Sequence, residues 1–428
     1  MKQILVLGAG RSSLALIRYL LDNAGSAGWL VTVADISIEA ANQKTNGHSC
    51  SRPTGMDVYD NDTRRKEISD ADLIVSLLPP HLHILAARDC VEFGKHLVTA
   101  SYTSPEIAAL SSEASNKGIL LLNEMGLDPG IDHMSAMRVI DKVHHSGGKV
   151  HSFRSYCGGL VTPEARTNPW EYKFTWNPRN VILAGKDGAR FLKDNKLVEV
   201  PYQRLFLETE IITTDSFGSL EAYPNRDSLN YREAYGLKDI STMLRGTLRP
   251  PGYCAAWNLF VQMGMTNDTE IVKDSGKITY HQLTERLPGS EHPSEDIMKK
   301  ILWTEIFDDK KIPLENATPA AILQELLERK WKMQDKDRDM VVMQHYFEYT
   351  SQDSSSHRSS STMIVYGDDA VNTAMAKTVG LPLGIAARLI LEGKIKAKGV
   401  CIPVMKEIYD PVLNELKTLK ISFEEKEY

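Results

Sequence analysis

The first 125 residues alternate short apolar runs with segments that have a helical period. The apolar runs fall at residues 3–7, 30–34, 73–78, 96–99 and 119–122. Runs of this length, rich in Val, Ile and Leu, are typical of strands buried on both faces. The alternation predicts an α/β domain in which βα units form a parallel sheet.

The pattern changes after about residue 150. Strand-like runs and the aromatic stretch 168–176 predict a second α/β domain, and residues from roughly 255 to 335 look helical and charged. Within that stretch Thr318-Pro319 is expected to open a helix with one apolar face, formed by Ile322, Leu323, Leu326 and Leu327. Runs 341–349 and 362–366 predict two strands, joined by a serine-rich loop at 351–357 that we interpret as a solvated hairpin tip without chemistry.

Local signals also place one helix after the fourth apolar run of the first domain. Ser104 can cap it, Pro105 suits its first turn, and Gly118 can end it.

Length and charge narrow the function classes. A chain of 428 residues is expected to form two or three domains. The formal net charge is −6 and no basic cluster stands out, which argues against a nucleic-acid partner. Five scattered cysteines without a CxxC pair indicate reduced thiols, and neither a signal peptide nor a membrane span is expected. We therefore expect a cytoplasmic protein without a metal site.

A glycine loop follows the first apolar run. Gly8-Ala9-Gly10-Arg11-Ser12-Ser13 precedes an amphipathic segment at 14–21, the context of a dinucleotide-binding turn. Gly8 would permit the tight turn and Gly10 the close approach of a pyrophosphate. Ser13 stands where the third glycine is common, so either helix and strand pack farther apart or its hydroxyl contacts phosphate.

Two further features concern the cofactor. Asp35 ends the second run, where a carboxylate can bind the adenosine ribose and repel a 2′-phosphate, so NAD is favoured over NADP. Arg11 or Arg52 could offset that repulsion. The segment 76–80 ends the third run, and we expect Leu77 and Leu78 to contact the cofactor; the alternative is that its prolines only end the strand.

Several longer blocks are recognisable. Ala100-Ser101-Tyr102 and the segments 126–133, 155–160, 172–176, 223–228, 245–249, 374–382 and 397–400 together resemble the glutamate-forming saccharopine dehydrogenases. The chain looks most like the dehydrogenase half of the bifunctional lysine-degradation enzyme.

The resemblance implies a homodimer of three-part subunits. Residues 1–129 would form a Rossmann domain, to which residues 395–428 return. Residues 130–260 and 340–394 would form the substrate and dimerisation domain, and residues 261–339 a helical subdomain.

The resemblance also implies residue roles. Substrate contacts would come from Ser101, Tyr102, Asp128, Arg226, Thr247, Leu248 and Arg249. Cofactor contacts would come from Gly8, Gly10, Arg11, Ser12, Ser13, Asp35, Ile36, Asp57, Leu77, Leu78, Ser101, Leu127, Asp128, Pro129 and Trp176. Guanidinium groups suit a substrate with three carboxylates; the alternative for each arginine is an ion pair within its domain.

The implied reaction transfers a hydride from saccharopine to the nicotinamide and releases L-glutamate and 2-aminoadipate 6-semialdehyde. It needs a group that moves protons near neutral pH. Asp128, Tyr102, His133 and Cys157 are candidates, with Asp128 preferred. Asp128 could instead cap a helix that begins at Pro129, and His133 is better interpreted as a packed histidine.

Two other functions stay open. One is a related amine dehydrogenase of the carboxynorspermidine type, and the other is a non-enzymatic dinucleotide sensor. A sugar-type oxidoreductase is disfavoured, because Ser101-Tyr102-Thr103 stands where a Glu-Lys-Pro triplet is expected.

Overall fold

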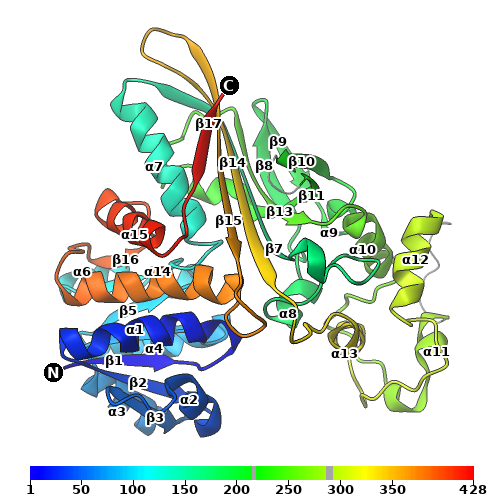
Figure 1. Cartoon of the computed structure of the whole chain (residues 1–428), viewed down its shortest axis with the longest axis horizontal. Helices are drawn as coiled ribbons and strands as arrows, with labels where there is room; N and C mark the ends of the chain where they lie inside the picture. The colour runs from blue at the N-terminus through cyan, green and yellow to red at the C-terminus, as the bar shows by residue number, and fades with distance from the viewer. Residues whose placement is uncertain (215–217, 286–292) are drawn as a thin grey trace. The chain divides into compact units, whose positions relative to one another are not determined.

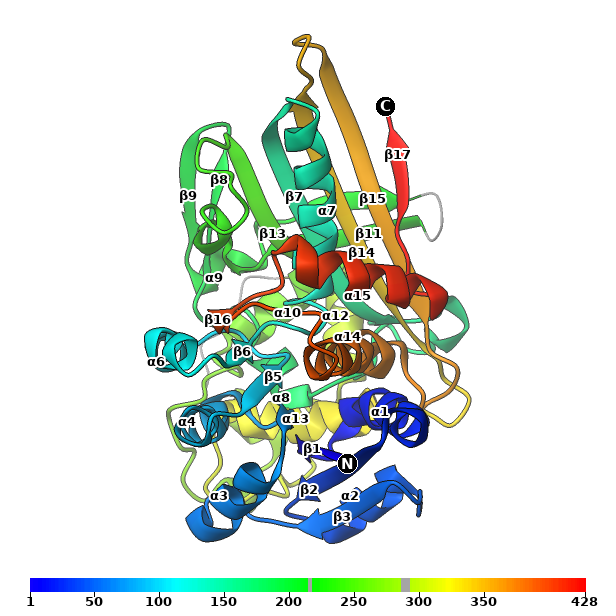
Figure 2. The same ribbon diagram turned by 90° about the vertical axis from the view of Figure 1, so that its left-hand side faces the viewer.

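The computed structural model describes residues 1–214, 218–285 and 293–428. The chain divides into two compact units (Figures 1 and 2). Unit 1 comprises Met1–Gly147 and Met363–Glu424, and unit 2 comprises Gly148–Thr362 and Glu425–Tyr428.

Unit 1 is built on a parallel seven-stranded sheet with the order β16-β6-β5-β4-β1-β2-β3. Its strands are β1 (Lys2–Leu7), β2 (Trp29–Asp35), β3 (Ser51–Gly55), β4 (Leu73–Ser76), β5 (His96–Thr99), β6 (Leu120–Leu122) and β16 (Gly399–Cys401). Its helices are α1 (Leu14–Ala27), α2 (Ile38–Thr45), α3 (Asn61–Asp70), α4 (His83–Phe93), α5 (Pro105–Ala108), α6 (Ser111–Asn116), α7 (Ile131–His145), α14 (Ala374–Leu391) and α15 (Lys406–Thr418). The five strands predicted from the apolar runs are all present, and β16 pairs with β6, so the C-terminal segment returns to this sheet. The expected return to residue 428 is too long, because residues 425–428 belong to unit 2.

Helices cover both faces of the parallel sheet. Strand residues such as Leu5, Ile74 and Leu97 share one buried cluster with Ile68 of α3 and Cys90 of α4. Helices α1 and α14 pack against each other, and α14 also contacts β4 and β5 (Figure 1). A sheet covered on both faces explains why its strands are apolar throughout.

Helix α14 is a long, apolar helix of unit 1. It has a mean hydropathy of 1.4, long and apolar enough by length and composition to cross a membrane, but 72% of it is buried in the fold. A Cβ at Gly380 would lie 2.7 Å from the backbone nitrogen of Leu16, and one at Gly384 would lie 2.5 Å from the ring of Tyr19. The two glycines therefore let α14 lie close against α1, as a core helix does.

The observed units differ from the expected domain boundaries. Residues 363–394, expected in the substrate domain, belong to unit 1, because α14 packs on α1. Residues 130–147 also belong to unit 1, where α7 packs on α15. An apolar helical period shows that a helix is buried but does not show in which core.

Unit 2 contains a mixed ten-stranded sheet. Its main path runs β10-β11-β13-β7-β14-β15-β17, and β8, β9 and β12 pair beside it. The strands are β7 (Lys149–Val161), β8 (Ala189–Lys193), β9 (Lys196–Val200), β10 (Glu210–Thr214), β11 (Gly218–Pro224), β12 (Arg226–Asp227), β13 (Thr242–Arg249), β14 (Asp339–Thr350), β15 (Ser356–Tyr366) and β17 (Glu424–Glu427). The predicted hairpin is confirmed, but β15 begins at Ser356, so part of the serine-rich segment lies in a strand.

The helices of unit 2 surround an aromatic core. They are α8 (Pro178–Ile182), α9 (Tyr202–Leu205), α10 (Tyr253–Gln262), α11 (Tyr280–Thr284), α12 (Glu295–Trp303) and α13 (Pro319–Lys330). Trp170, Trp257 and Trp331 are fully buried in one cluster that also holds Leu323 and Leu326 of α13. Helices α11, α12 and α13 lie within residues 261–339, as expected, and this helical part shares its core with the rest of unit 2.

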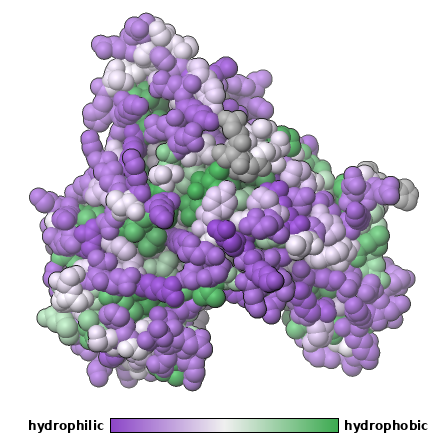
Figure 3. All heavy atoms as spheres, viewed as in Figure 1, coloured by the Kyte–Doolittle hydropathy of each residue, from purple (hydrophilic) through white to green (hydrophobic). Residues whose placement is uncertain are grey.

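Local helix signals are mostly confirmed. The side chains of Ser104 and Thr318 accept backbone N–H bonds and cap α5 and α13, and the expected apolar face of α13 is buried. The helix predicted after Ser104 is two short helices, α5 and α6. Hydrophilic residues cover most of the surface in view (Figure 3).

Candidate functional site

The glycine loop lies at the carboxyl edge of the parallel sheet. Gly8 donates its backbone N–H to the carbonyl of Ala34 at 2.8 Å, and Leu77 donates to the carbonyl of Leu7 at 2.8 Å. These two bonds bring the ends of β1, β2 and β4 together. The loop then passes through the 3-10 turn Arg11–Ser13 into α1, so it stands where a doubly wound sheet binds dinucleotides.

Gly8 and Gly10 are needed for different reasons. Gly8 has a φ of +103°, and a Cβ there would lie 3.1 Å from the carbonyl oxygen of Leu77, so the fold itself requires glycine. Gly10 has a φ of −67°, and a Cβ there would meet nothing within 4 Å. Since the fold would accept a side chain at position 10, a bare backbone there fits the close approach of a phosphate.

Ser13 is committed to the loop itself. Its side chain is buried, and its hydroxyl donates to the carbonyl of Gly10 at 2.8 Å. Within the protein the hydroxyl proton is thus used inside the loop, and contact between this hydroxyl and phosphate stays a prediction.

Asp35 is tied to the loop by its carboxylate. One oxygen accepts the backbone N–H of Ala9 at 2.7 Å, and the other accepts that of Ser37 at 2.9 Å. Asp35 therefore holds the glycine loop against the end of β2. Two donors offset part of its charge and occupy part of the accepting capacity that we had assigned to a ribose.

The other expected cofactor residues are spread along the same edge. Ile36 is 78% exposed beside Asp35, and Asp57, which is also exposed, accepts the N–H of Tyr59 with one carboxylate oxygen. Leu77 and Leu78 follow β4 and are half-buried. Arg52 binds Glu67 with both terminal nitrogens of its guanidinium, so it is occupied by an ion pair.

Residues expected to meet the substrate follow β5 and β6. Ser101 and Tyr102 come after β5, and the Tyr102 hydroxyl lies 3.5 Å from a carboxylate oxygen of Asp128. Asp128 is half-buried, while Leu127 and Pro129 beside it are buried. Helix α7 begins at Ile131 and is preceded by Gly130, whose N–H bonds Asp132 at 2.6 Å. The alternative interpretation of Asp128 as the cap of this helix is therefore wrong.

A buried acid that the sequence analysis missed supports this segment. Glu124 donates its backbone N–H to the carbonyl of Ser101 at 3.1 Å, and its carboxylate accepts the N–H of Thr103 at 3.0 Å. Its other oxygen lies 2.9 Å from Nε2 of His133, which is fully buried. Glu124 thus fixes the backbone on both sides of Tyr102, and His133 is a packed histidine, as expected. A polar Asn123-Glu124 pair directly after an apolar strand was the available signal.

A second missed residue, His83, joins the ends of β4 and β5. Its Nδ1 lies 2.8 Å from the hydroxyl of Ser76, and its Nε2 lies 2.7 Å from the hydroxyl of Ser101. Burial lowers the pKa of His83 to about 4, so the ring is neutral near pH 7.

In unit 2, Arg249 is buried without a counter-ion among the described residues. Its side chain lies over the rings of Tyr172, Tyr223 and Tyr253, with its central carbon 5.3 to 5.8 Å from their centroids. Burial raises the pKa of all three tyrosines, so they stay neutral. No described carboxylate forms an ion pair with Arg249, and its Nε has no hydrogen-bond partner there. The domain-internal ion pair that we left open for Arg249 is thus not seen within the ranges that the structure describes.

The remaining expected residues of unit 2 lie on or near the same sheet. Thr247 and Leu248 precede Arg249 on β13, and Trp176 is packed against the aromatic core that contains Tyr172. Arg226 is exposed, with a φ of +56°. Cys157 is buried on β7.

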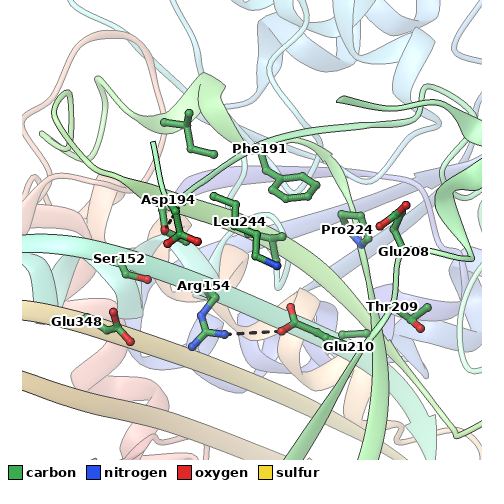
Figure 4. A pocket seen from close by; sticks show the side chains of 14 residues that line it. Ser152, Arg154, Phe191, Asp194, Glu208, Thr209, Glu210, Pro224, Leu244 and Glu348 are labelled. Carbon is green, nitrogen blue, oxygen red and sulfur yellow. Dashed lines mark hydrogen bonds and ion pairs between the residues drawn. The ribbon is translucent and has the colours of Figure 1, made fainter. Parts of the chain in front are cut away.

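A pocket of about 330 Å³ lies elsewhere on unit 2 (Figure 4). Arg154 and Glu210 line it and form an ion pair at 3.7 Å. Its lining includes none of the expected site residues.

Two family models match the chain and together cover most of it. The saccharopine dehydrogenase NADP binding domain matches residues 4–122. The saccharopine dehydrogenase C-terminal domain matches residues 126–421, more than half of the chain.

Individual relatives agree with the models. The chain is 36% identical to saccharopine dehydrogenase [NADP(+), L-glutamate-forming] of Pyricularia oryzae, over 97% of this chain and 96% of that one. It is 34% identical to the mitochondrial alpha-aminoadipic semialdehyde synthase of Bos taurus, over 99% of this chain but 47% of that one.

A solved structure matches over the whole length. The apo saccharopine dehydrogenase (L-Glu forming) of Saccharomyces cerevisiae superposes with a TM-score of 0.90 at 33% identity and covers 100% of both chains. A homospermidine synthase from Legionella pneumophila, at 9% identity and a TM-score of 0.58 over 99% of this chain and 91% of that one, shares the fold alone. On these matches, the chain belongs to the saccharopine dehydrogenase family.

Proposed function

We propose that this protein oxidises saccharopine with a nicotinamide dinucleotide and releases L-glutamate and 2-aminoadipate 6-semialdehyde. The names of its relatives support this reaction. Within this chain, the main observation in favour of the proposal is the buried guanidinium of Arg249.

The environment of Arg249 supports an anionic substrate. A buried guanidinium without a carboxylate partner is costly for a folded protein, since its desolvation is not repaid by an opposite charge. A carboxylate of saccharopine would provide that charge and could accept two parallel N–H bonds, which fixes the orientation of the substrate. Arg226, which is exposed, would bind a second carboxylate.

The cofactor would lie on the glycine loop of unit 1. Gly10 offers a bare backbone to the pyrophosphate, and the dinucleotide would supply the hydride acceptor. The comparisons favour NADP over NAD, against our expectation from Asp35. We propose NADP, because the N–H groups of Ala9 and Ser37 already offset part of the Asp35 charge, and Arg11 is exposed at the start of the adjoining turn.

Asp128 and Tyr102 would handle the protons of the reaction. Loss of the hydride leaves an imine that water must attack and split, and a positioned acid or base assists both steps. Asp128 is half-buried beside the Tyr102 hydroxyl. His133 is less suited, because it is fully buried behind Glu124.

A direct assay tests the proposal. NADPH formation would be followed by its absorbance after adding saccharopine, and the amino acid released would be identified. Glutamate released in step with NADPH supports the proposal, whereas lysine in step with NADPH contradicts it. Carboxynorspermidine in place of saccharopine tests the alternative amine substrate, which the comparisons do not favour. Dinucleotide binding without turnover of either amine would indicate a sensor.

We also propose that the protein works in a reducing compartment such as the cytoplasm and as a homodimer. All five cysteines are free thiols, which is consistent with a reducing environment. Light scattering after gel filtration would measure the oligomeric state.

A further inference from the structure

The ring of His83 connects two serine hydroxyls at the carboxyl edge of the parallel sheet. Ser76 ends β4, His83 begins α4, and Ser101 follows β5. His83 is 1% exposed and Ser76 is fully buried, but Ser101 is half-buried. The chain of hydrogen bonds therefore begins in the core and ends at the edge of the sheet.

The positions of the protons in the hydrogen bonds between Ser76, His83 and Ser101 can be assigned by starting from Ser76. The hydroxyl of Ser76 forms no hydrogen bond within the described residues other than that with Nδ1 of His83. A buried hydroxyl needs an acceptor for its proton, so Ser76 donates and Nδ1 accepts. In a neutral imidazole the other nitrogen then carries the hydrogen, so Nε2 donates to Ser101.

Because Nε2 of His83 donates to Ser101, the Ser101 hydroxyl can donate its own proton to another acceptor. Ser101 accepts from His83 at 2.7 Å, and its hydroxyl has no further hydrogen bond in the described part of the chain. An acceptor atom on a bound ligand could accept this proton from the Ser101 hydroxyl.

We propose that His83 is a positioning residue that presents the hydroxyl of Ser101 as a donor to a carboxylate oxygen of saccharopine. The inference rests on the proposed function and deepens it. A carboxylate is the strongest acceptor on such a substrate, and hydrogen bonds that run in one direction polarise one another.

A double-mutant cycle tests whether His83 acts through Ser101. The variants are His83→Phe, Ser101→Ala and the two combined, with kcat/KM measured for saccharopine. Loss of one hydrogen bond to a charged group gives about a tenfold or larger decrease. Each single variant is expected to lower kcat/KM by about tenfold through a higher KM for saccharopine, and the double variant is expected to be no worse than Ser101→Ala.

Two further variants separate positioning from folding. His83→Gln keeps an N–H donor and is expected to recover part of the loss. His96 is the matched control, because it is half-buried on the same sheet and its Nδ1 accepts the N–H of Leu120 at 3.0 Å. His96→Gln is expected to leave the KM for saccharopine within about twofold of wild type, as for a residue whose side chain accepts a hydrogen bond from the backbone away from the expected substrate.

Nitrogen NMR of histidine-labelled protein provides a readout without turnover. His83 is expected to stay neutral at about pH 6, with its hydrogen on Nε2, because burial lowers its pKa. Its Nε2 resonance is expected to shift in Ser101→Ala. A hydrogen on Nδ1, or a resonance that Ser101→Ala leaves unmoved, would overturn the proposal.

The kinetic measurements can also contradict the role proposed for His83. Additive effects in the cycle, or a change in the KM for the dinucleotide with none for saccharopine, would show that His83 does not act on the substrate through Ser101. If the wild-type protein does not turn over saccharopine but the NMR spectra show the hydrogen on Nε2 of His83, the proposed function is contradicted. The assignment of the protons between Ser76, His83 and Ser101 is then still supported.

Discussion

The carboxylate of Asp35 accepts the backbone N–H of Ala9 at 2.7 Å, across 26 residues of sequence. One side chain thus shapes the glycine loop and also sets the charge at the expected adenosine ribose. Because a 2′-phosphate carries nearly two negative charges, the charge of Asp35 should influence the choice between NAD and NADP.

Asp35→Asn is expected to raise the ratio of kcat/KM with NADP to kcat/KM with NAD by about tenfold. The amide keeps an acceptor oxygen for Ala9 but removes the negative charge, and a change of about 1.4 kcal/mol corresponds to this factor. Steady-state kinetics with both cofactors measure the ratio. An unchanged ratio would mean that Asp35 does not lie near the 2′ position. Asp62→Asn, at an exposed carboxylate in α3 of the same unit, is the comparison.

Arg226→Ala is expected to raise the KM for saccharopine by roughly ten- to a hundredfold with little change in dinucleotide affinity. A lost hydrogen bond between charged groups typically costs about 1.5 to 3 kcal/mol. Arg226 is exposed, so its removal should not disturb the core. Calorimetric titration with the dinucleotide provides the control. A fall in dinucleotide affinity that matched the rise in KM would assign Arg226 to the cofactor or to the fold.

Arg249→Met is expected to weaken saccharopine binding while leaving the thermal stability of the ligand-free protein unchanged or higher. The guanidinium is buried with no carboxylate partner among the described residues, so an apolar side chain of similar length removes a desolvation cost. Saccharopine should raise the Tm of wild-type protein, as any ligand of the folded state does, but not that of the variant.

Arg64→Met provides the contrast for Arg249. Arg64 is also buried, but it bonds Asp89 at 2.7 Å. Removing it leaves the carboxylate with only the half-exposed Arg65 as an ion-pair partner among the residues described, and breaking a buried pair typically costs about 3 to 5 kcal/mol. A similar loss of Tm in both variants would show that Arg249 is needed for the fold.

The sequence predicted the framework of the site better than its internal contacts. The glycine loop and strand ends follow from short-range patterns, so Gly8, Gly10 and Asp35 were placed correctly on the carboxyl edge. The pairs Glu124–His133 and His83–Ser101 join residues 9 and 18 positions apart. No spacing rule marks such pairs, because the sheet creates their proximity.

The domain boundaries failed for a related reason. The apolar period of residues 374–391 identifies a buried helix, but Gly380 and Gly384 identify its partner only once Leu16 and Tyr19 are seen against them. The hydrogen bond from the Ser13 hydroxyl to the carbonyl of Gly10 could likewise not be predicted from sequence, because it depends on how the loop folds.

His83 should make the stability of unit 1 depend on pH. Burial lowers its pKa from 6.5 to about 4, and the charge of His81 adds to this shift. Below about pH 6.5 the unfolded chain binds a proton that the folded protein does not bind. Stability should therefore fall as pH decreases from about 6.5 towards 4, by up to about 3 kcal/mol from this group. Urea unfolding of wild type and His83→Gln at about pH 7 and pH 5 measures it: the variant should lose less stability, and equal losses would contradict the shift.

Gly10→Ala and Gly8→Ala test two different reasons for glycine in the loop. At position 10 glycine would be needed for the approach of a ligand, and at position 8 it is needed for the backbone conformation. A Cβ at Gly10 meets nothing within 4 Å, and its φ of −67° suits alanine. Gly10→Ala should therefore keep the wild-type Tm, or raise it slightly by restricting the unfolded chain. If a pyrophosphate lies against this backbone, the added methyl should weaken dinucleotide binding by about tenfold or more, since close approach is the reason for glycine there.

Gly8→Ala is expected to lower the Tm whether or not a ligand is present. Gly8 has a φ of +103°, and an added methyl group would lie 3.1 Å from the carbonyl oxygen of Leu77, so alanine is strained there. Differential scanning fluorimetry with and without NADP, together with NADPH fluorescence titration, measures the effects of both substitutions. If the Gly10→Ala protein is stably folded and binds the dinucleotide as tightly as wild type does, the added methyl group does not obstruct a phosphate. The pyrophosphate would then not lie on this loop.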